Sequence, residues 1–341
     1  MNKEKYTIQE SMAAFEPPIL IVSSFVGRGN YSIGEAFKQQ CGDGVACYHE
    51  AVEDLLPSSA VQEDLQRYKW IANNLRFLFY LIYTIPLFYY RKYAREKWLC
   101  KTNLSVLEKK VRTLGIKTVI CVSHRPAFWL SLLKVRTKLD FSLWGVLAEF
   151  GTNLGWRYIF WDSMNGYLSV IPQKQLKIDF PIGLSFKDLE LPCRKEFFEM
   201  AHTKADKDNL LFVAGYWGQM EIRKAIDLIK RLLIEFPGLK VHVVCGTNEI
   251  LEKEIRNYFS SNGYVKIYNN VDSLLDIMSN CASVVTKPGF STLVEAHSAA
   301  RKIFLLKGMP IAEDHNAAYA IDNFSAEWYS IENFKRWYTV S

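Results

Sequence analysis

The chain has 341 residues, of which 49% are hydrophobic and 23% are charged. This length predicts two domains rather than one core, and the composition excludes an intrinsically disordered protein. The formal net charge of +6 does not call for a nucleic-acid partner, but it suits an anionic substrate or an anionic membrane surface.

The first part of the chain predicts an alternation of buried strands and helices. Continuous apolar runs indicate parallel strands at residues 18–24, 117–122, 141–147 and 167–171. A glycine turn follows the first strand and consists of Gly27, Arg28, Gly29 and Asn30. A helix is predicted directly after it, and strand, glycine turn and helix in this order open a βαβ unit.

A hydrophobic segment at residues 75–98 interrupts this alternation. Its apolar part, 77–90, is shorter than the roughly 20 residues that a bilayer-spanning helix needs. Pro86 divides it, and basic residues follow at 91–97. Aromatic and basic residues in this combination favour contact with a membrane–water interface. A buried pair of aromatic helices with a solvated basic end is the open alternative.

The seven cysteines are scattered and odd in number, without metal-ligand spacing. They predict buried thiols in a reducing compartment. The N-terminal sequence MNKEKYTIQE lacks the apolar core of a signal peptide. We therefore expect a cytoplasmic protein, with a peripheral contact at the inner face of the cell membrane as an extension of that expectation.

The regular pattern breaks between residues 172 and 186, where Pro172, Pro181 and Gly183 occur without a clear period. We place the inter-domain linker in this stretch. The predicted domains are residues 1–180 and 181–322, and a tail of residues 323–341 is expected to return toward the first domain.

The second part of the chain predicts another α/β series. Strands are expected at residues 209–214, 240–245, 264–268, 283–286 and 303–306, and helices at 222–236, 249–257 and 272–281. The predicted fold class is therefore α/β, with two doubly wound domains. Such domains bind ligands at the carboxyl ends of their strands, where the polar and glycine residues of both halves occur.

The stretch SVVTKPGFSTLVEA carries the most specific signal. A strand ends in a Pro-Gly turn, and Gly289, Phe290, Ser291 and Thr292 then open a helix. A helix start presents backbone N–H groups to a phosphate, which predicts a diphosphate site. Glu295 follows by about one helical turn, where its carboxylate could accept hydrogen bonds from a ribose. An ordinary helix N-cap is the alternative.

At this point the second half resembles the nucleotide-sugar glycosyltransferases of the GT-B fold. The closest group is of family 28 type, with the peptidoglycan N-acetylglucosaminyltransferase and the monogalactosyl- and processive diacylglycerol glycosyltransferases. The resemblance is carried in order by VVCGTNEILEKEI, NNVDSLLDIMSNCASVVTKPGFSTLVEA and MPIAEDHNAAYAIDN. The first half is similar more loosely through SSFVGRGNYSIGEAF, FLFYLIYTIPLFYYRKY and LAEFGTNLGW.

The resemblance implies two Rossmann-like domains that face a central cleft. The second domain would bind a UDP-sugar, and the first would bind an acceptor, a membrane lipid by analogy with the diacylglycerol enzymes. The implied reaction is an inverting hexose transfer to a hydroxyl group, that is, glycolipid synthesis. Helix N-terminal dipoles would stabilise the departing uridine diphosphate, so neither a cofactor nor a tightly bound metal is expected.

Residue roles follow from the resemblance and from the chemistry of the side chains. Gly215 and Gln219 would approach the diphosphate or sugar, and Gly246 and Asn248 would lie near the uracil. Hexose hydroxyls would meet a loop after Pro310 that carries Glu313, Asp314 and Asn316.

An inverting transfer needs a base near the acceptor hydroxyl. Glu149 is the first candidate because partial desolvation makes a carboxylate a better base near neutral pH. His124 is the second. The turn of residues 27–30 would bind the acceptor or the departing phosphate.

Three departures from the family pattern keep other functions open. Asn30 stands where the family has a histidine, Ala312 stands where it has a glutamine, and the stretch after Asn323 is short. One alternative is a transferase for a soluble natural product or a nucleotide-sugar epimerase on the same fold. Another is a sugar-nucleotide-binding or membrane-docking subunit without chemistry of its own.

Overall fold

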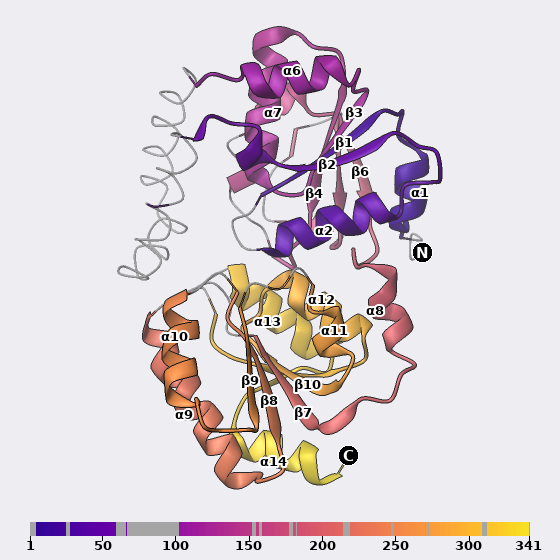
Figure 1. Ribbon diagram of the computed structural model, residues 1–341. Helices are drawn as coiled ribbons and strands as arrows, with labels where there is room; N and C mark the ends of the chain where they lie inside the picture. The colour runs from indigo at the N-terminus through magenta and orange to yellow at the C-terminus, as the bar shows by residue number, and fades with distance from the viewer. Residues whose placement is uncertain are drawn as a thin grey trace. The chain divides into compact units, whose positions relative to one another are not determined.

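The computed structural model describes residues 5–24, 28–58, 66, 102–151, 155–156, 159–176, 180–181, 183–213, 219–246, 249–269, 271, 273–308 and 312–340. The chain forms two compact units, Met1–Tyr68 with Tyr80–Arg194, and Lys69–Phe79 with Lys195–Ser341. Each unit contains a six-stranded parallel sheet, drawn as arrows in Figure 1. The predicted α/β class with two doubly wound domains is confirmed.

The first unit is built around a sheet with the strand order β2-β1-β3-β4-β5-β6. Its strands are β1 (Ile19–Ser23), β2 (Cys47–Ala51), β3 (Thr118–Cys121), β4 (Ser142–Leu147), β5 (Gly166–Ser169) and β6 (Ser185–Asp188). Its longer helices are α1 (Ile8–Ala13), α2 (Arg28–Gln39), α6 (Ser105–Thr113) and α7 (His124–Thr137). All residues of β1 and β3 are buried, which is why both strands are continuous apolar runs.

The second unit has the strand order β12-β11-β10-β7-β8-β9. Its strands are β7 (Asp206–Val213), β8 (Lys240–Val244), β9 (Val265–Tyr268), β10 (Cys281–Thr286), β11 (Lys302–Leu305) and β12 (Glu327–Trp328). Its helices are α8 (Lys195–Met200), α9 (Gln219–Glu235), α10 (Glu249–Tyr258), α11 (Leu275–Met278), α12 (Phe290–Ser298), α13 (Ala312–Asn323) and α14 (Ile331–Val340).

Each sheet has one point where the strand order reverses. In the first sheet it lies between β1 and β3, and in the second it lies between β7 and β10. The loops that follow neighbouring strands diverge there and leave room at the carboxyl edge of the sheet. These two edges carry the residues that the sequence singles out.

The sequence did not predict the edge strands β2, β6 and β12 or the helices α1, α6, α7, α8, α13 and α14. β2 and β6 lie at the two edges of the first sheet, where polar residues are tolerated on exposed faces. β6 begins at the end of the expected linker, and the first unit continues to Arg194. The helix expected at 272–281 is shorter, because only Leu275–Met278 are helical and Cys281 begins β10.

The last helix, α14, belongs to the core of the second unit. Phe334 is fully buried and contacts the rings of Phe236 and Phe304 at centroid distances of 5.1 and 5.3 Å. The predicted tail is therefore folded, and its aromatic side chains close one end of the second core.

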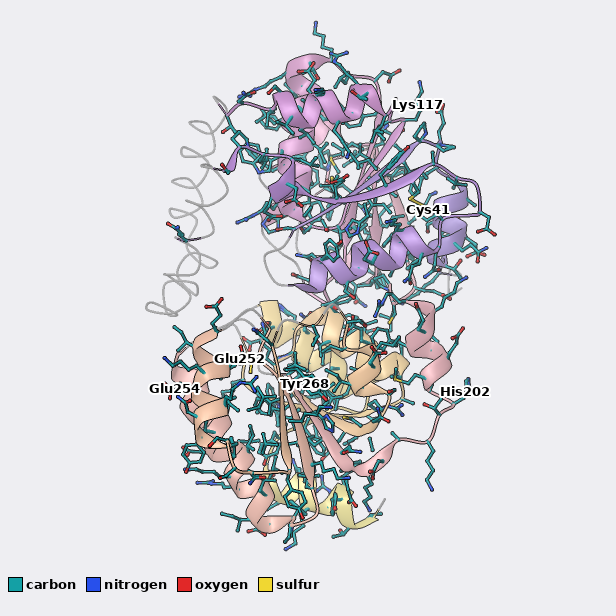
Figure 2. All side chains as sticks on the ribbon, in the orientation of Figure 1. Cys41, Lys117, His202, Glu252, Glu254 and Tyr268 are labelled. Carbon is teal, nitrogen blue, oxygen red and sulfur yellow. A yellow bond between two sulfur atoms is a disulfide. The ribbon has the colours of Figure 1, made fainter. Side chains whose placement is uncertain are left out.

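The expectation of unpaired, buried thiols holds for four cysteines and is wrong for two. Cys121, Cys193, Cys245 and Cys281 are buried and reduced. Cys41 and Cys47 form a disulfide across the turn between α2 and β2, with 6.7 Å between their Cα atoms (Cys41 is labelled in Figure 2). The turn brings the two residues together although six positions separate them.

None of the helices within the described ranges is long and apolar enough to cross a bilayer. The segment 75–98, for which an interfacial role was predicted, lies outside the described residues.

Three histidines give the folded state a specific pH dependence. Burial lowers the pKa of His49, His242 and His297, so the folded state disfavours their protonation relative to the unfolded chain. Their contribution to stability is complete above pH 6.5, the ordinary histidine pKa, and is lost as the pH falls through the lower folded pKa. We expect the melting temperature to fall as the pH decreases below about 6.5. Each single His→Asn variant should have a shallower slope between about pH 5 and 7, and equal slopes would contradict this.

Candidate active site

A small pocket opens at the carboxyl edge of the first sheet. Its polar lining includes Asn30, Ser123, His124 and Glu149, and apolar side chains such as Trp156 and Phe180 also line it. Its volume is about 20 Å³, which accommodates one group of the size of a water molecule or a hydroxyl. The structure therefore brings together three residues that the sequence places far apart, including both candidate bases.

Three neighbouring strands position these side chains. Asn30 lies in the first turn of α2, after β1; His124 is the first residue of α7, after β3; and Glu149 follows β4 by two residues. Parallel strands end at the same edge of the sheet, so the three positions converge. The predicted acceptor turn is only partly a turn, because Arg28, Gly29 and Asn30 are already helical. Gly27 lies outside the described residues.

The imidazole of His124 is held by close packing. It meets the indole of Trp156 edge-on with 6.4 Å between ring centroids. A Cβ atom at Gly155 would clash with the imidazole, so only glycine lets the backbone approach it so closely. Trp156 is itself 4% exposed and packs edge-on against Tyr167. Sequence reasoning assigned no role to Gly155 or Trp156, although both belong to the quoted LAEFGTNLGW stretch.

The second site forms where β10 leads into α12. Gly289 is the N-cap residue of α12, with φ −73° and ψ 127°, and no side chain caps the helix start. Among the described residues other than its two chain neighbours, none has a heavy atom within 4 Å of the position that a Cβ atom at Gly289 would occupy. Phe290 is buried, and Ser291 and Thr292 are half-buried in the first turn. The Gly289 N–H donates to the carbonyl of Lys287 over 2.7 Å, so the helix start presents its positive dipole end and the N–H groups of Ser291 and Thr292 to an anion.

Glu295 lies one turn further along α12 and is 7% exposed. Ser291 donates a hydrogen bond from Oγ to its Oε1 over 3.2 Å. The two residues are four positions apart and share one face of the helix. The helix and the Ser291 hydroxyl therefore fix the position of the Glu295 carboxylate, which is shielded from bulk water.

Two contacts tie α13 to the Pro-Gly turn. Lys287 Nζ lies 2.5 Å from Glu313 Oε1, and Asn316 Nδ2 donates to the carbonyl of Pro288 over 3.2 Å. Glu313 and Asn316 are both buried, whereas Asp314 is exposed. The expectation that these three residues lie on a loop is wrong, because they belong to α13. Lys287, which no sequence argument selected, places a cation beside the turn.

The remaining nucleotide-side candidates follow β7 and β8. Gly246 comes after β8 with φ +60°. Gln219 begins α9, and its side chain is not among those described. Gly215 and Asn248 lie outside the described residues. Within the parts of the chain that the structure describes, no three His, Cys, Asp or Glu side chains come together as a metal site.

The chain is similar in sequence to curated bacterial glucosyltransferases. No protein-family model matches it. A processive diacylglycerol beta-glucosyltransferase of Bacillus cytotoxicus is 25% identical over 327 residues, which cover 89% of this chain and 79% of that protein. The enzyme of the same name from Bacillus cereus is also 25% identical, over 325 residues, with the same coverage.

Solved structures share the fold along nearly the whole chain. MurG of Acinetobacter baumannii superposes with a TM-score of 0.52 at 11% identity, covering 94% of this chain and 89% of its own. A UDP-GlcNAc 2-epimerase of Neisseria meningitidis, bound to UDP-GlcNAc, gives a TM-score of 0.50 at 11% identity and covers 94% and 90%. The Streptomyces glycosyltransferase SsfS6 also gives 0.50, at 12% identity and with the same coverage.

These neighbours include transferases and an epimerase, so the fold does not decide the reaction. The two parallel sheets, the shared fold and the sequence similarity over 89% of the chain together confirm the resemblance to the GT-B glycosyltransferases of family 28 type.

Proposed function

We propose that this chain is a UDP-sugar-dependent glycosyltransferase that moves a hexose to a hydroxyl group of a membrane lipid, with inversion at the anomeric carbon. The observation that carries the proposal is the glycine-capped start of α12, with Lys287 beside it and Glu295 one turn further on. Backbone N–H groups, a helix dipole and a cation are the groups that bind a diphosphate. The names of the curated relatives support the sugar donor and the lipid acceptor.

The donor would be held by the second unit. The diphosphate accepts hydrogen bonds from the N–H groups of Ser291 and Thr292 at the helix start that Gly289 and Phe290 shape, and it faces the ammonium group of Lys287. Glu295 accepts hydrogen bonds from the ribose hydroxyls, and Glu313 and Asn316 face the hexose. The negative charge on the departing UDP grows in the transition state. The positive dipole end of α12 therefore stabilises the transition state more than the ground state.

The acceptor hydroxyl would enter the pocket of the first unit. Glu149 removes its proton as the oxygen attacks the anomeric carbon, and the bond from that carbon to the UDP oxygen breaks on the opposite side. His124 is the second candidate for this step. Asn30 offers an amide that can orient the hydroxyl by donating or accepting a hydrogen bond. The scheme needs no bound metal or other cofactor.

The segment 75–98 is proposed to bind the lipid surface that carries the acceptor. Replacing Phe79, Tyr83 and Phe88 together by serine should reduce binding to anionic liposomes, because the aromatic side chains would no longer enter the interface. Added salt should weaken the binding of the unaltered protein, since the adjacent basic residues attract anionic lipid. Cosedimentation measures both effects. Binding that persists unchanged in both tests would remove this segment from the proposal.

The reaction is tested by incubating the protein with radiolabelled UDP-sugars, with and without diacylglycerol vesicles. Release of UDP and transfer of label to lipid only in the presence of vesicles supports the proposal. Transfer to a soluble hydroxyl without lipid would identify the natural-product transferase, and an isomerised nucleotide sugar would identify the epimerase. UDP binding without any turnover would identify the non-catalytic subunit.

A further inference from the structure

A buried histidine in the first unit has hydrogen-bonding partners on both ring nitrogens. His49 lies in β2, and its side chain is fully buried. Its Nε2 is 2.8 Å from Oγ of Ser23, the last residue of β1, and its Nδ1 contacts Oε1 of Glu35 in α2. We call these three residues the His49 clamp. It joins two strands and one helix at a place that the proposed reaction does not use directly.

The partners determine which nitrogen carries the proton. A carboxylate only accepts hydrogen bonds, so Nδ1 of His49 donates to Glu35. In the neutral ring Nε2 then accepts, and the Ser23 hydroxyl donates to it. Burial lowers the pKa of His49, while Glu35 acts in the opposite direction. Lys38 of α2 also lowers it and Glu50 of β2 raises it, and the neutral ring prevails.

Serine, histidine and carboxylate in this order also occur in serine hydrolases. Here the serine cannot act as a nucleophile, because Ser23 is 0% exposed. None of the three clamp residues lines the pocket that the described residues form. The clamp therefore fixes the positions of the elements that it joins and does not perform covalent chemistry.

The clamp contacts α2 at the middle of the helix, through Glu35 and Gly34. A Cβ atom at Gly34 would clash with the His49 ring, so the helix lies directly on the imidazole. Tyr31 packs against the same ring with 4.5 Å between centroids. Asn30 is four residues before Gly34 and shares its face of the helix. The imidazole thus contacts both the middle of α2 and Tyr31, the neighbour of the pocket residue Asn30 in the first turn.

We propose that His49 is a positioning residue, which fixes Asn30 in the acceptor pocket through its bonds to Ser23 and Glu35. The proposal rests on the function proposed above, in which Asn30 orients the acceptor hydroxyl. It adds that recognition of the hydroxyl also depends on His49, a residue outside the pocket. Donor binding, which belongs to the second unit, does not depend on it.

The test compares S23A and H49N with H242Q. S23A removes one hydrogen bond and leaves the imidazole in place; H49N keeps a donor toward Glu35 and loses the contact with Ser23. His242 is the matched control, a half-buried strand histidine of the second unit that lies 3.0 Å from Tyr268 Oη and 3.3 Å from Asn209 Oδ1. Tyr268 is labelled in Figure 2.

We expect S23A and H49N to raise the KM for the lipid acceptor about fivefold or more, with UDP affinity unchanged. H242Q should leave the acceptor KM unchanged. In the unaltered protein the acceptor KM should rise as the pH falls and His49 gains a proton, since protonated Nε2 no longer accepts from Ser23. S23A lacks that bond at every pH and should show a flatter profile. Acceptor KM values equal to wild type in S23A and H49N would overturn the proposal.

Hydrogen exchange gives a readout that does not require activity. Amides in the first turn of α2 should exchange faster in S23A and H49N than in the unaltered protein, while those of α7 keep their protection. Unchanged exchange in α2 would overturn the positioning role even if no turnover had been found. If the unaltered protein shows no turnover but the α2 amides exchange faster in both variants, the proposed function is refuted and the positioning role of His49 is not.

Discussion

Glu149→Gln should reduce turnover about 100-fold or more and leave UDP affinity near that of the unaltered protein. Glutamine has nearly the same shape as glutamate, but its amide cannot take the proton from the acceptor hydroxyl. Glu149 lines the pocket of the first unit, whereas the proposed nucleotide site belongs to the second. The loss should therefore appear in kcat, measured from steady-state transfer to lipid, and not in nucleotide binding measured by calorimetry.

Glu108→Gln is the matched control for this prediction. Glu108 lies on α6 of the same unit and forms a surface ion pair with Arg112, with 2.8 Å between Arg112 Nη2 and its Oε1. Surface pairs of this kind contribute little to stability, so the control should have nearly unaltered activity. A near wild-type rate for Glu149→Gln would remove Glu149 as the base. His124→Gln would then be the variant expected to lose turnover.

Gly289→Asp should weaken uridine diphosphate binding about 100-fold or more, because the new carboxylate would oppose the diphosphate at a distance of a few ångströms. The fold should tolerate the change. The φ of −73° suits any residue, and aspartate is a favourable N-cap. Apart from the chain neighbours, no residue that the structure describes has a heavy atom within 4 Å of the new Cβ position. Calorimetric titration with UDP measures the binding, and the melting temperature should stay level or rise.

Two further variants separate charge from bulk. Gly289→Asn has the same size and also caps a helix, so it should weaken UDP binding less than aspartate does. Gly238→Asp adds a carboxylate to an open turn between α9 and β8 and should leave UDP binding unchanged. If Gly289→Asp binds UDP as tightly as the unaltered chain, the anion does not lie at the α12 start, and the donor site proposed here is wrong.

Local signals explain which parts of the fold could be predicted. β1 and β3 are central and fully buried, so their apolar runs are continuous and stand out from the neighbouring turns. β2 and β6 lie at sheet edges and mix polar with apolar residues, which hides them from the same criterion. α13 was taken for a loop because Pro310 precedes it and because the first turn of the helix is polar, which obscured the helical period.

The residues of the candidate sites also differ in whether a local sequence signal marks them. The order strand, Pro-Gly turn and helix at residues 283–296 specifies a helix start whatever the rest of the chain does, because turn and capping preferences are local. Glu149 and His124 could be selected because each directly follows a predicted strand. Lys287 was passed over because nothing near it in the sequence marks its partner, Glu313, which is 26 residues away.

By itself, then, the sequence determined two parallel sheets, the helix start at Gly289 and the residues at the carboxyl ends of the central strands. Local backbone preference and the burial of apolar runs are sufficient for these. Only the tertiary structure decided that Asn30, His124 and Glu149 share one pocket, that α13 is tied to the Pro-Gly turn, and that His49 joins Ser23 to Glu35. Those contacts depend on strand order and on side chains distant in sequence, which no periodic pattern records.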